Sequence, residues 1–179
     1  MTYGLQHDIG AYLLAELAQA TVDITAGGSG DNAEQNGQAI NRLATGRRHY
    51  ESAALVIAYR ATLAQAATLS VAANGQHAPV SNFASGAVDL MAKRAYQIAG
   101  DGTKTAMTLT SGLLAATVVA TGGAGGSTES GVVVLEFDLA SVQQYLRSQI
   151  TFDLSAATTD TARMTAVWVF GGADALPTA

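Results

Sequence analysis

The residues whose spacing best fits catalysis are two carboxylates, Glu136 and Asp138. They lie two positions apart in a run typical of a β-strand, so both side chains should share one face of it. A pair of carboxylic acids flanking a scissile bond is what glycosidases use. Two acids on the solvated face of a strand are the commoner meaning of this pattern. We therefore expect no enzyme.

Glycine-rich segments give partial matches to motifs that bind phosphate or calcium. Gly28, Gly30 and Ala33 have the spacing of a dinucleotide fingerprint, but no helix signal follows that would hold a pyrophosphate. Residues 27–31 come close to a calcium-binding nonapeptide, which occurs once although such sites need stacked repeats. Residues 102–105 have the Lys-Thr ending of a phosphate loop. They lack its glycine directly before the lysine and its glycine five residues earlier. We expect no cofactor and no metal site.

Nucleophiles and metal ligands are sparse as well. The chain has no cysteine, which excludes disulfides, thiolate nucleophiles and sulfur-ligated metals. His7, His49 and His77 are scattered, so a metal site would need them to converge in space. The Gly-x-Ser-x-Gly elbow of a serine hydrolase is not present in the sequence. The sequence therefore contains no recognisable set of catalytic residues.

Composition excludes several classes of function. Among the 179 residues, 13% are charged and 49% hydrophobic, so most of the chain has too few charges for a disordered protein. The net charge of −5 is opposite in sign to what phosphate neutralisation needs. Apolar runs are far shorter than the ~20 residues of a membrane-spanning helix, and no secretory signal is recognisable. We expect neither nucleic acid nor a membrane as partner.

The hydrophobic pattern predicts one domain that is mainly β. Residues 131–139, 145–154 and 161–171 are rich in β-branched, aromatic and other apolar residues and are separated by short polar breaks. Residues 51–61 contain a nearly continuous apolar run, which is typical of a strand covered on both faces. Short strands with turns about every 8–12 residues predict an antiparallel β-sandwich, with a jelly-roll-like arrangement favoured. We expect this sandwich to span residues 21–179.

Residues 1–20 are expected to form an arm or a short helix outside that body. Ile9, Leu13, Leu14 and Leu17 have the spacing of the apolar stripe of an amphipathic helix. An arm that becomes ordered on contact with a partner is the alternative. These apolar side chains are candidate contacts to another protein subunit. On this interpretation, deletion of residues 1–20 leaves a folded body.

A small basic cluster and several aromatic residues are further candidates for contacts. Arg47 and Arg48 form the densest positive spot, which we expect to touch another protein subunit. A carbohydrate-binding sandwich would instead use exposed aromatic side chains. The candidates are Tyr50, Tyr59, Tyr96 and Trp168. Trp168 lies in an apolar strand and is expected in the core, which weakens the carbohydrate alternative.

The last third of the chain contains the most specific motifs. Tyr145 and Arg147 form a Tyr-x-Arg strand motif, and an Asp-Leu-Ser-Ala turn follows at 153–156. Then come Thr-Asp-Thr at 159–161 and an apolar strand that leads into Gly-Gly-Ala-Asp-x-Leu-Pro at 171–177. With these motifs the chain resembles small structural proteins of tailed bacteriophages. The likeness extends over most of the chain, and its motifs mark a fold rather than an active site.

The resemblance implies a non-enzymatic structural protein of the virion. Many proteins of that group are jelly-roll or β-sandwich decoration (cement) proteins, which stabilise the capsid from its exterior by binding over subunit junctions. The implied partner is the major capsid protein, and a homotrimer is expected because shells have threefold axes. The apolar arm and the basic spot would make the contacts. A connector or tail component of the same particle, assembled as a ring, is the alternative.

Overall fold

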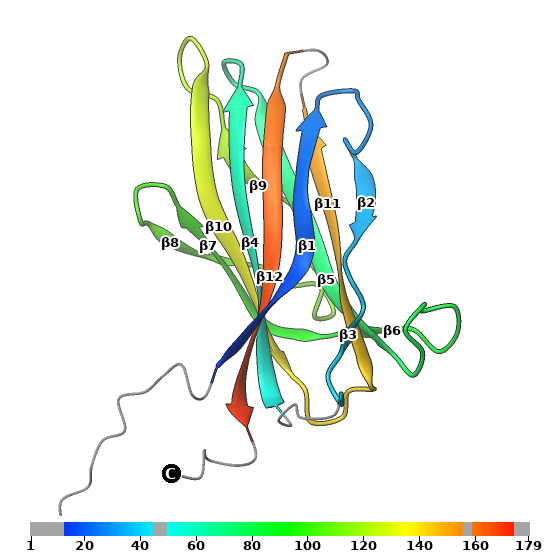
Figure 1. Cartoon of the computed structure of the whole chain (residues 1–179). Helices are drawn as coiled ribbons and strands as arrows, with labels where there is room; N and C mark the ends of the chain where they lie inside the picture. The colour runs from blue at the N-terminus through cyan, green and yellow to red at the C-terminus, as the bar shows by residue number, and fades with distance from the viewer. Residues whose placement is uncertain (1–12, 45–49, 156–158, 174–179) are drawn as a thin grey trace, which may run out of the picture.

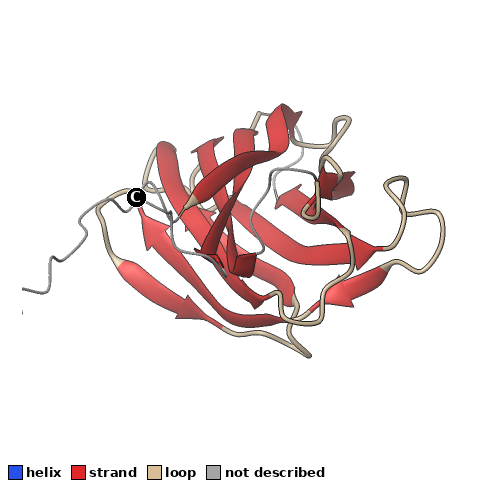
Figure 2. Cartoon of the chain, turned by 60° about the horizontal axis from the view of Figure 1, so that its bottom comes forward, coloured by secondary structure: helices blue, strands red, loops and turns tan. Residues whose placement is uncertain are grey.

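A computed structural model describes residues 13–44, 50–155 and 159–173 (Figure 1). The regular structure within these ranges consists of strands, and Figure 2 shows strands and loops there without a helix. The strands are β1 (Leu14–Thr25), β2 (Ala33–Asn36), β3 (Ile40–Asn41), β4 (Tyr50–Leu63), β5 (Thr68–Ala78), β6 (Val88–Leu90), β7 (Ala92–Ala99), β8 (Lys104–Met107), β9 (Leu114–Thr121), β10 (Ser127–Asp138), β11 (Tyr145–Leu154) and β12 (Thr161–Ala173).

Two antiparallel sheets pack face to face, so the expected antiparallel β-sandwich is confirmed (Figures 1 and 2). One sheet has six strands in the order β1-β12-β4-β10-β7-β8. The other has the order β3-β11-β5-β6, and β9 also pairs with β5. The segment that leads into β2 is tied to β11 by a hydrogen bond from the backbone N–H of Asn32 to the carbonyl oxygen of Phe152. The core lies between these two layers.

Four strand pairs are nested along the chain. β1 pairs with β12, β3 with β11, β4 with β10, and β5 with β9. Two further pairings, β4 with β12 and β5 with β11, join these pairs into the two sheets. β6, β7 and β8 come between β5 and β9 in the sequence and pair beside β5 and β10. The chain therefore runs out and back as one long antiparallel hairpin wrapped into two layers.

Aromatic side chains of the six-stranded sheet form the centre of the core. Trp168 of β12 is fully buried, and its ring centroid lies 5.4 Å from that of Phe137 and 6.3 Å from that of Phe170. Gly75 of β5 faces the indole from the opposite sheet, where a Cβ would lie 3.1 Å from Trp168 Cη2. The missing side chain at Gly75 leaves room for the indole. The expected core position of Trp168 is confirmed.

The prediction of a helix near the N-terminus is wrong for residues 14–19, the part of that segment that the structure describes as a strand. Residues 14–25 form β1, which pairs with β12 at the edge of the six-stranded sheet. Its register slips between Leu17 and Gln19 and again between Gln19 and Val22, as at β-bulges. Leu13, Leu14 and Leu17 come before these slips and lie on both faces of the strand, so their positions imitate helical spacing. Pairing with β12 outweighs the helix preference of the alanines and leucines in this segment.

The position of β1 also changes where an arm can end. The strand runs across residues 20 and 21, the expected boundary between arm and sandwich. Its core-facing residues Ala18 and Ile24 lie on either side of that boundary and are both buried. Deletion of residues 1–20 would therefore remove half of an edge strand and part of the core. Residues 1–12, the rest of the expected arm, lie outside the described ranges.

Gly75→Val is expected to destabilise the protein, because the new side chain would meet Trp168 and Leu90 across the core. A Cβ at position 75 would also lie 3.3 Å from Leu90 Cδ2. Overpacking of this kind costs about 1–3 kcal/mol in the free energy of unfolding, which urea denaturation measures. Ser70→Val, on the outward face of the same strand, is the matched control and should change it by less than about 0.5 kcal/mol. Equal free energies of unfolding for both variants would contradict the packing described.

Candidate functional site

The outward face of the six-stranded sheet is apolar across its central strands. In β4, Val56 points outward between two fully buried neighbours. Val134 of β10 and Val167 of β12 likewise point away from the core between buried residues. The sequence predicted that residues 51–61 are covered on both faces, but the described chain covers them on one. The second face is where a contact with another molecule would bury apolar surface.

Outward side chains of five neighbouring strands are in register and form one continuous row. We call this row the outer apolar band; its residues are Leu17, Val167, Val56, Val134 and Tyr96. Val134, next to the last residue of the row, is 6% exposed because its neighbours cover it. At the β1 end Leu17 is 44% exposed. An apolar centre of this kind is typical of the buried middle of protein–protein interfaces.

Charged residues flank the outer apolar band at both margins. Toward the start of β12, Arg163 Nε lies 2.5 Å from Asp23 Oδ1, and its Nη2 lies 3.0 Å from Oδ2. Toward the other end of the sheet, Lys93 Nζ lies 2.6 Å from Asp138 Oδ2. All four side chains are largely exposed. The face therefore has an apolar centre and a charged rim, which is the usual anatomy of an interface.

A groove of about 860 Å³ continues this face toward the start of β1 and the end of β12. Leu13, Ala54, Val169 and Gly171 line its apolar part. Ala54 and Val169 are paired in the row next to the outer apolar band, so the groove and the band are continuous. Leu13, at the first described residue, is 46% exposed. Apolar surface therefore extends to the point where the described chain begins.

The structure separates the contact residues that the sequence suggested. Leu13 and Leu17 lie on the outward face, in the groove and in the outer apolar band respectively. Leu14 stands opposite Phe170 and packs against the core instead. Three further candidates lie outside the described residues: Ile9, Arg47 and Arg48. The role of all six in binding a partner stays a prediction.

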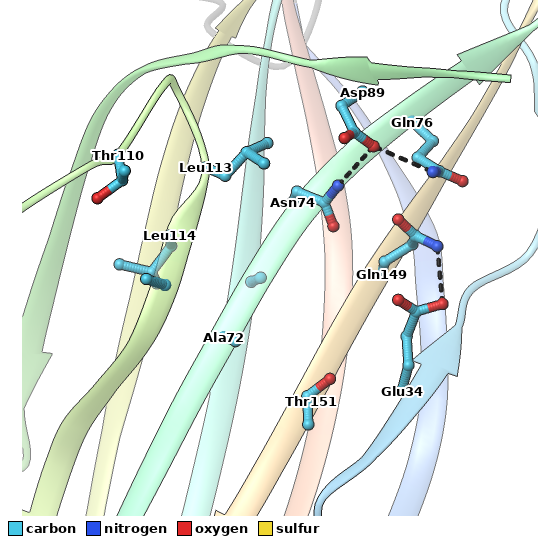
Figure 3. Close-up of a pocket in the computed structure, with 12 residues that line it drawn as sticks. Glu34, Ala72, Asn74, Gln76, Asp89, Thr110, Leu113, Leu114, Gln149 and Thr151 are labelled. Carbon is cyan, nitrogen blue, oxygen red and sulfur yellow. Dashed lines mark hydrogen bonds between the residues drawn. The ribbon is translucent and has the colours of Figure 1, made fainter.

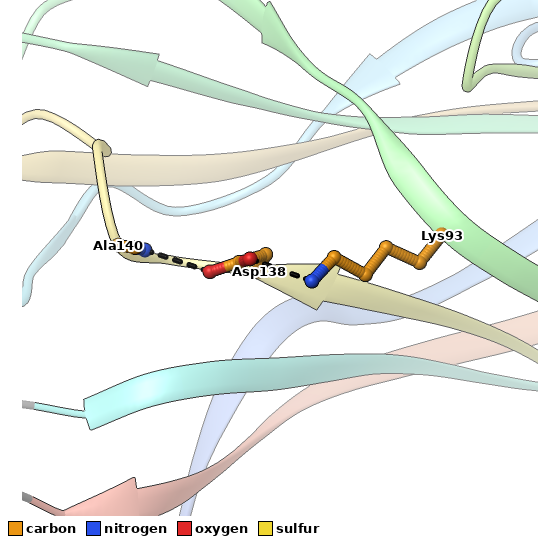
Figure 4. Close-up of polar contacts among 3 residues, drawn as sticks. All are labelled: Lys93, Asp138 and Ala140. Carbon is orange, nitrogen blue, oxygen red and sulfur yellow. Dashed lines mark hydrogen bonds and ion pairs between the residues drawn. The ribbon is translucent and has the colours of Figure 1, made fainter.

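Glu136 and Asp138 lie on one face of β10, as their spacing predicts, but Asp138 is unsuited to general acid catalysis. A hydrogen bond from Lys93 and a second, of 2.9 Å, from the backbone N–H of Ala140 lower the pKa of Asp138 below its ordinary value of 3.8 (Figure 4). A general acid at neutral pH needs a raised pKa. Glu136 stands opposite Arg94 on the neighbouring strand. The acids therefore belong to the charged rim.

A second hollow, of about 550 Å³, lies on the outward face of the other sheet (Figure 3). Its polar groups bind one another: Asp89 Oδ1 accepts hydrogen bonds from Asn74 Nδ2 and Gln76 Nε2, each 3.0 Å long. Gln149 Nε2 donates to Glu34 Oε1 at 2.7 Å. Amides and carboxylates of this kind can hydrogen-bond hydroxyl groups, but they include no nucleophile next to a base.

The aromatic side chains considered for sugar binding do not gather at one groove. Trp168 and Tyr59 are buried. Tyr50 packs against the core. Tyr96 lies in the outer apolar band, where Lys104 Nζ sits 3.7 Å from the centre of its ring. A sugar would therefore find no shared aromatic platform among these four residues.

Backbone contacts account for the glycine-rich turn that resembled a calcium motif. Asp31 Oδ2 accepts a hydrogen bond from the backbone N–H of Gly27 at 2.6 Å, and its Oδ1 accepts one from that of Leu154 at 2.9 Å. Within the described ranges, no group of three His, Cys, Asp or Glu side chains could hold a metal ion. The same ranges contain no helix that is long and apolar enough to cross a membrane.

Comparison with known proteins leaves the family open. No family model matches the chain, and no curated protein matches it. Among solved structures it is similar to infectious bursal disease virus Gx strain and to the VP2 subviral particle of that virus, each at 8% identity and a TM-score of 0.24. Each similarity covers 90% of this chain and 42% of the other, so the chain spans less than half the length of its matches. Both neighbours are viral particles, at a distance that carries no argument about this chain.

Lys93→Met is expected to raise the pKa of Asp138 toward 3.8, as followed by an NMR pH titration of its carboxyl carbon. The pKa of Asp138 should rise only part of the way, because the hydrogen bond from the backbone N–H of Ala140 remains. A lowered carboxyl pKa adds stability above the unfolded-state value, and this stability is lost as the pH falls through the folded-state pKa. The variant should therefore differ from wild type above pH 3.8 and converge with it in acid.

Lys104→Met is the control for that titration, since Lys104 contacts the ring of Tyr96 instead. It should leave the pKa of Asp138 unchanged. An identical titration of Asp138 in wild type and in Lys93→Met would show that the ion pair does not form in solution.

Proposed function

We propose that this chain is a non-enzymatic structural protein of a tailed-phage virion. In this proposal it binds the exterior of the capsid over junctions between subunits, as a decoration (cement) protein. Its partner is the major capsid protein, and it acts as a homotrimer. The observation that carries the proposal is the outer apolar band, because a neighbouring subunit would bury the exposed Leu17 together with the half-buried Val56 and Val167.

The proposal includes a jelly-roll arrangement of the sandwich. A rolled hairpin of four nested strand pairs gives two layers of four strands, and jelly rolls occur in viral capsid proteins. Here the layers would be β1-β12-β4-β10 and β3-β11-β5-β9, and the pairings support both. β6, β7 and β8 would then be an insertion between β5 and its partner β9.

The motifs behind the resemblance support a structural role. Tyr145 and Arg147 lie at the start of β11, where Arg147 Nη2 donates a hydrogen bond of 2.7 Å to Gln76 Oε1 of β5. The Arg147 guanidinium also lies 4.4 Å from the ring centre of Phe83. These contacts join β11 to β5 and to the loop that contains Phe83. They explain why the motif would mark a fold rather than an active site.

A connector or tail component of the same particle is the second candidate. The outer apolar band would then lie between neighbouring subunits of a ring, and the chain would occur in a few copies per particle. The two candidates share the apolar contact and differ in symmetry and copy number.

Deletion of residues 1–12 is the experiment that tests attachment through the arm. β1 begins at Leu14, so the shortened chain keeps every described strand and should unfold at the same temperature as the full chain. We expect it to lose attachment to capsids, with at least about tenfold fewer copies sedimenting with the particles. Deletion of residues 174–179, beyond the end of β12, is the control and should retain attachment. Full attachment after removal of residues 1–12 would contradict a contact through the arm.

A further inference from the structure

We infer that the outer apolar band lies at an interface between copies of this chain. This goes beyond the proposed function, because it names the surface through which copies meet and applies to the isolated chain. The band forms the apolar centre, and the ion pair Arg163–Asp23 forms the rim on one side. On the other side lies the groove, which Lys93 and Asp138 line together with Leu13 and Val169.

The size of this face follows from the spacing of its strands. Five strands spaced about 4.8 Å apart give a width of roughly 19 Å, and six residues along β12 give a length of roughly 20 Å. The resulting footprint of roughly 400 Å² is a projected area, and it includes Glu136 and Arg94 beside the outer apolar band. It is about half of the ~800 Å² that each partner contributes to a standard interface.

The edges of the six-stranded sheet direct a partner to its face. At one edge, β1 carries two register slips, and the carbonyl oxygen of Ala18 accepts a hydrogen bond of 2.9 Å from the backbone N–H of Gln38. At the other edge, β8 has four residues and includes Lys104. Bulges, short length and lysine are the devices by which edge strands avoid pairing with another chain. A partner would therefore pack on the face rather than add a strand.

Charge complementarity favours a second copy as the occupant. Each margin of the band carries one positive and one negative charge. These are Arg163 and Asp23 at one margin, and Lys93 and Asp138 at the other. Copies can therefore meet so that opposite charges face each other and like charges are kept apart. A strongly charged partner of one sign would find no matching surface here.

The test uses the full chain in isolation, by light scattering after size exclusion and by sedimentation equilibrium. We expect wild type to form oligomers and Leu17→Asp to weaken their association at least ~100-fold, because a charge would be buried at the edge of the band. Val118→Asp is the matched control: Val118 is 51% exposed on β9 of the other sheet, and its replacement should leave association unchanged. A monomeric wild type at about 100 μM, or equal association of Leu17→Asp and wild type, would overturn the inference.

A second readout does not depend on a disruptive substitution. Because the chain has no cysteine, a nitroxide can be attached at a single site in Leu17→Cys or in Val118→Cys. The label at position 17 should be immobilised in the oligomer and become mobile on dilution, whereas the label at position 118 should stay mobile. Equal mobility at both positions in an oligomer would place the interface elsewhere, for example on the face that binds a shell subunit. Neither readout involves virions, so failure here contradicts the homotrimer but leaves attachment to the capsid standing, and loss of the capsid role leaves this interface standing.

Discussion

The central strands β4, β10 and β12 are apolar on both faces, but the described core covers only their inner faces. On the inner face, Trp168 fills the space above Gly75 and fixes how the two sheets meet. On the outer face, the same strands place Val167, Val56 and Val134 in one row. Because alternate residues of a strand point to opposite faces, neither set can change its face without a shift of the whole register. The fold thus places an apolar row on the outward face of its own sheet.

Several carboxylates among the described residues help to hold this fold. Asp31 closes a turn onto β11, and Asp160 Oδ1 accepts a hydrogen bond of 2.8 Å from the backbone N–H of Ala64. Asp138 is paired with Lys93, and Asp89 binds two amide side chains. Carboxylates used in this way are not free to act as acids or bases on a substrate. The paired carboxylates named here therefore hold the fold.

The sequence predicted the features that depend on local alternation. The strands of the last third and the buried position of Trp168 follow directly from their apolar patterns. The helix over residues 14–19 was wrong, because apolar residues on both faces of an edge strand imitate helical spacing. The outer apolar band could be suspected from the continuous apolar run at residues 51–61. Its membership depends on the register between distant strands, such as Val56 with Val167, which no local pattern contains.

The abundance of this chain in purified virions, relative to the major shell protein, is the most direct test of a structural role in the particle. Quantitative mass spectrometry measures it without any change to the chain. A decoration protein bound over subunit junctions predicts copy numbers close to those of the shell protein, and a connector or tail component predicts a few copies per particle. Absence of the chain from virions would contradict the account.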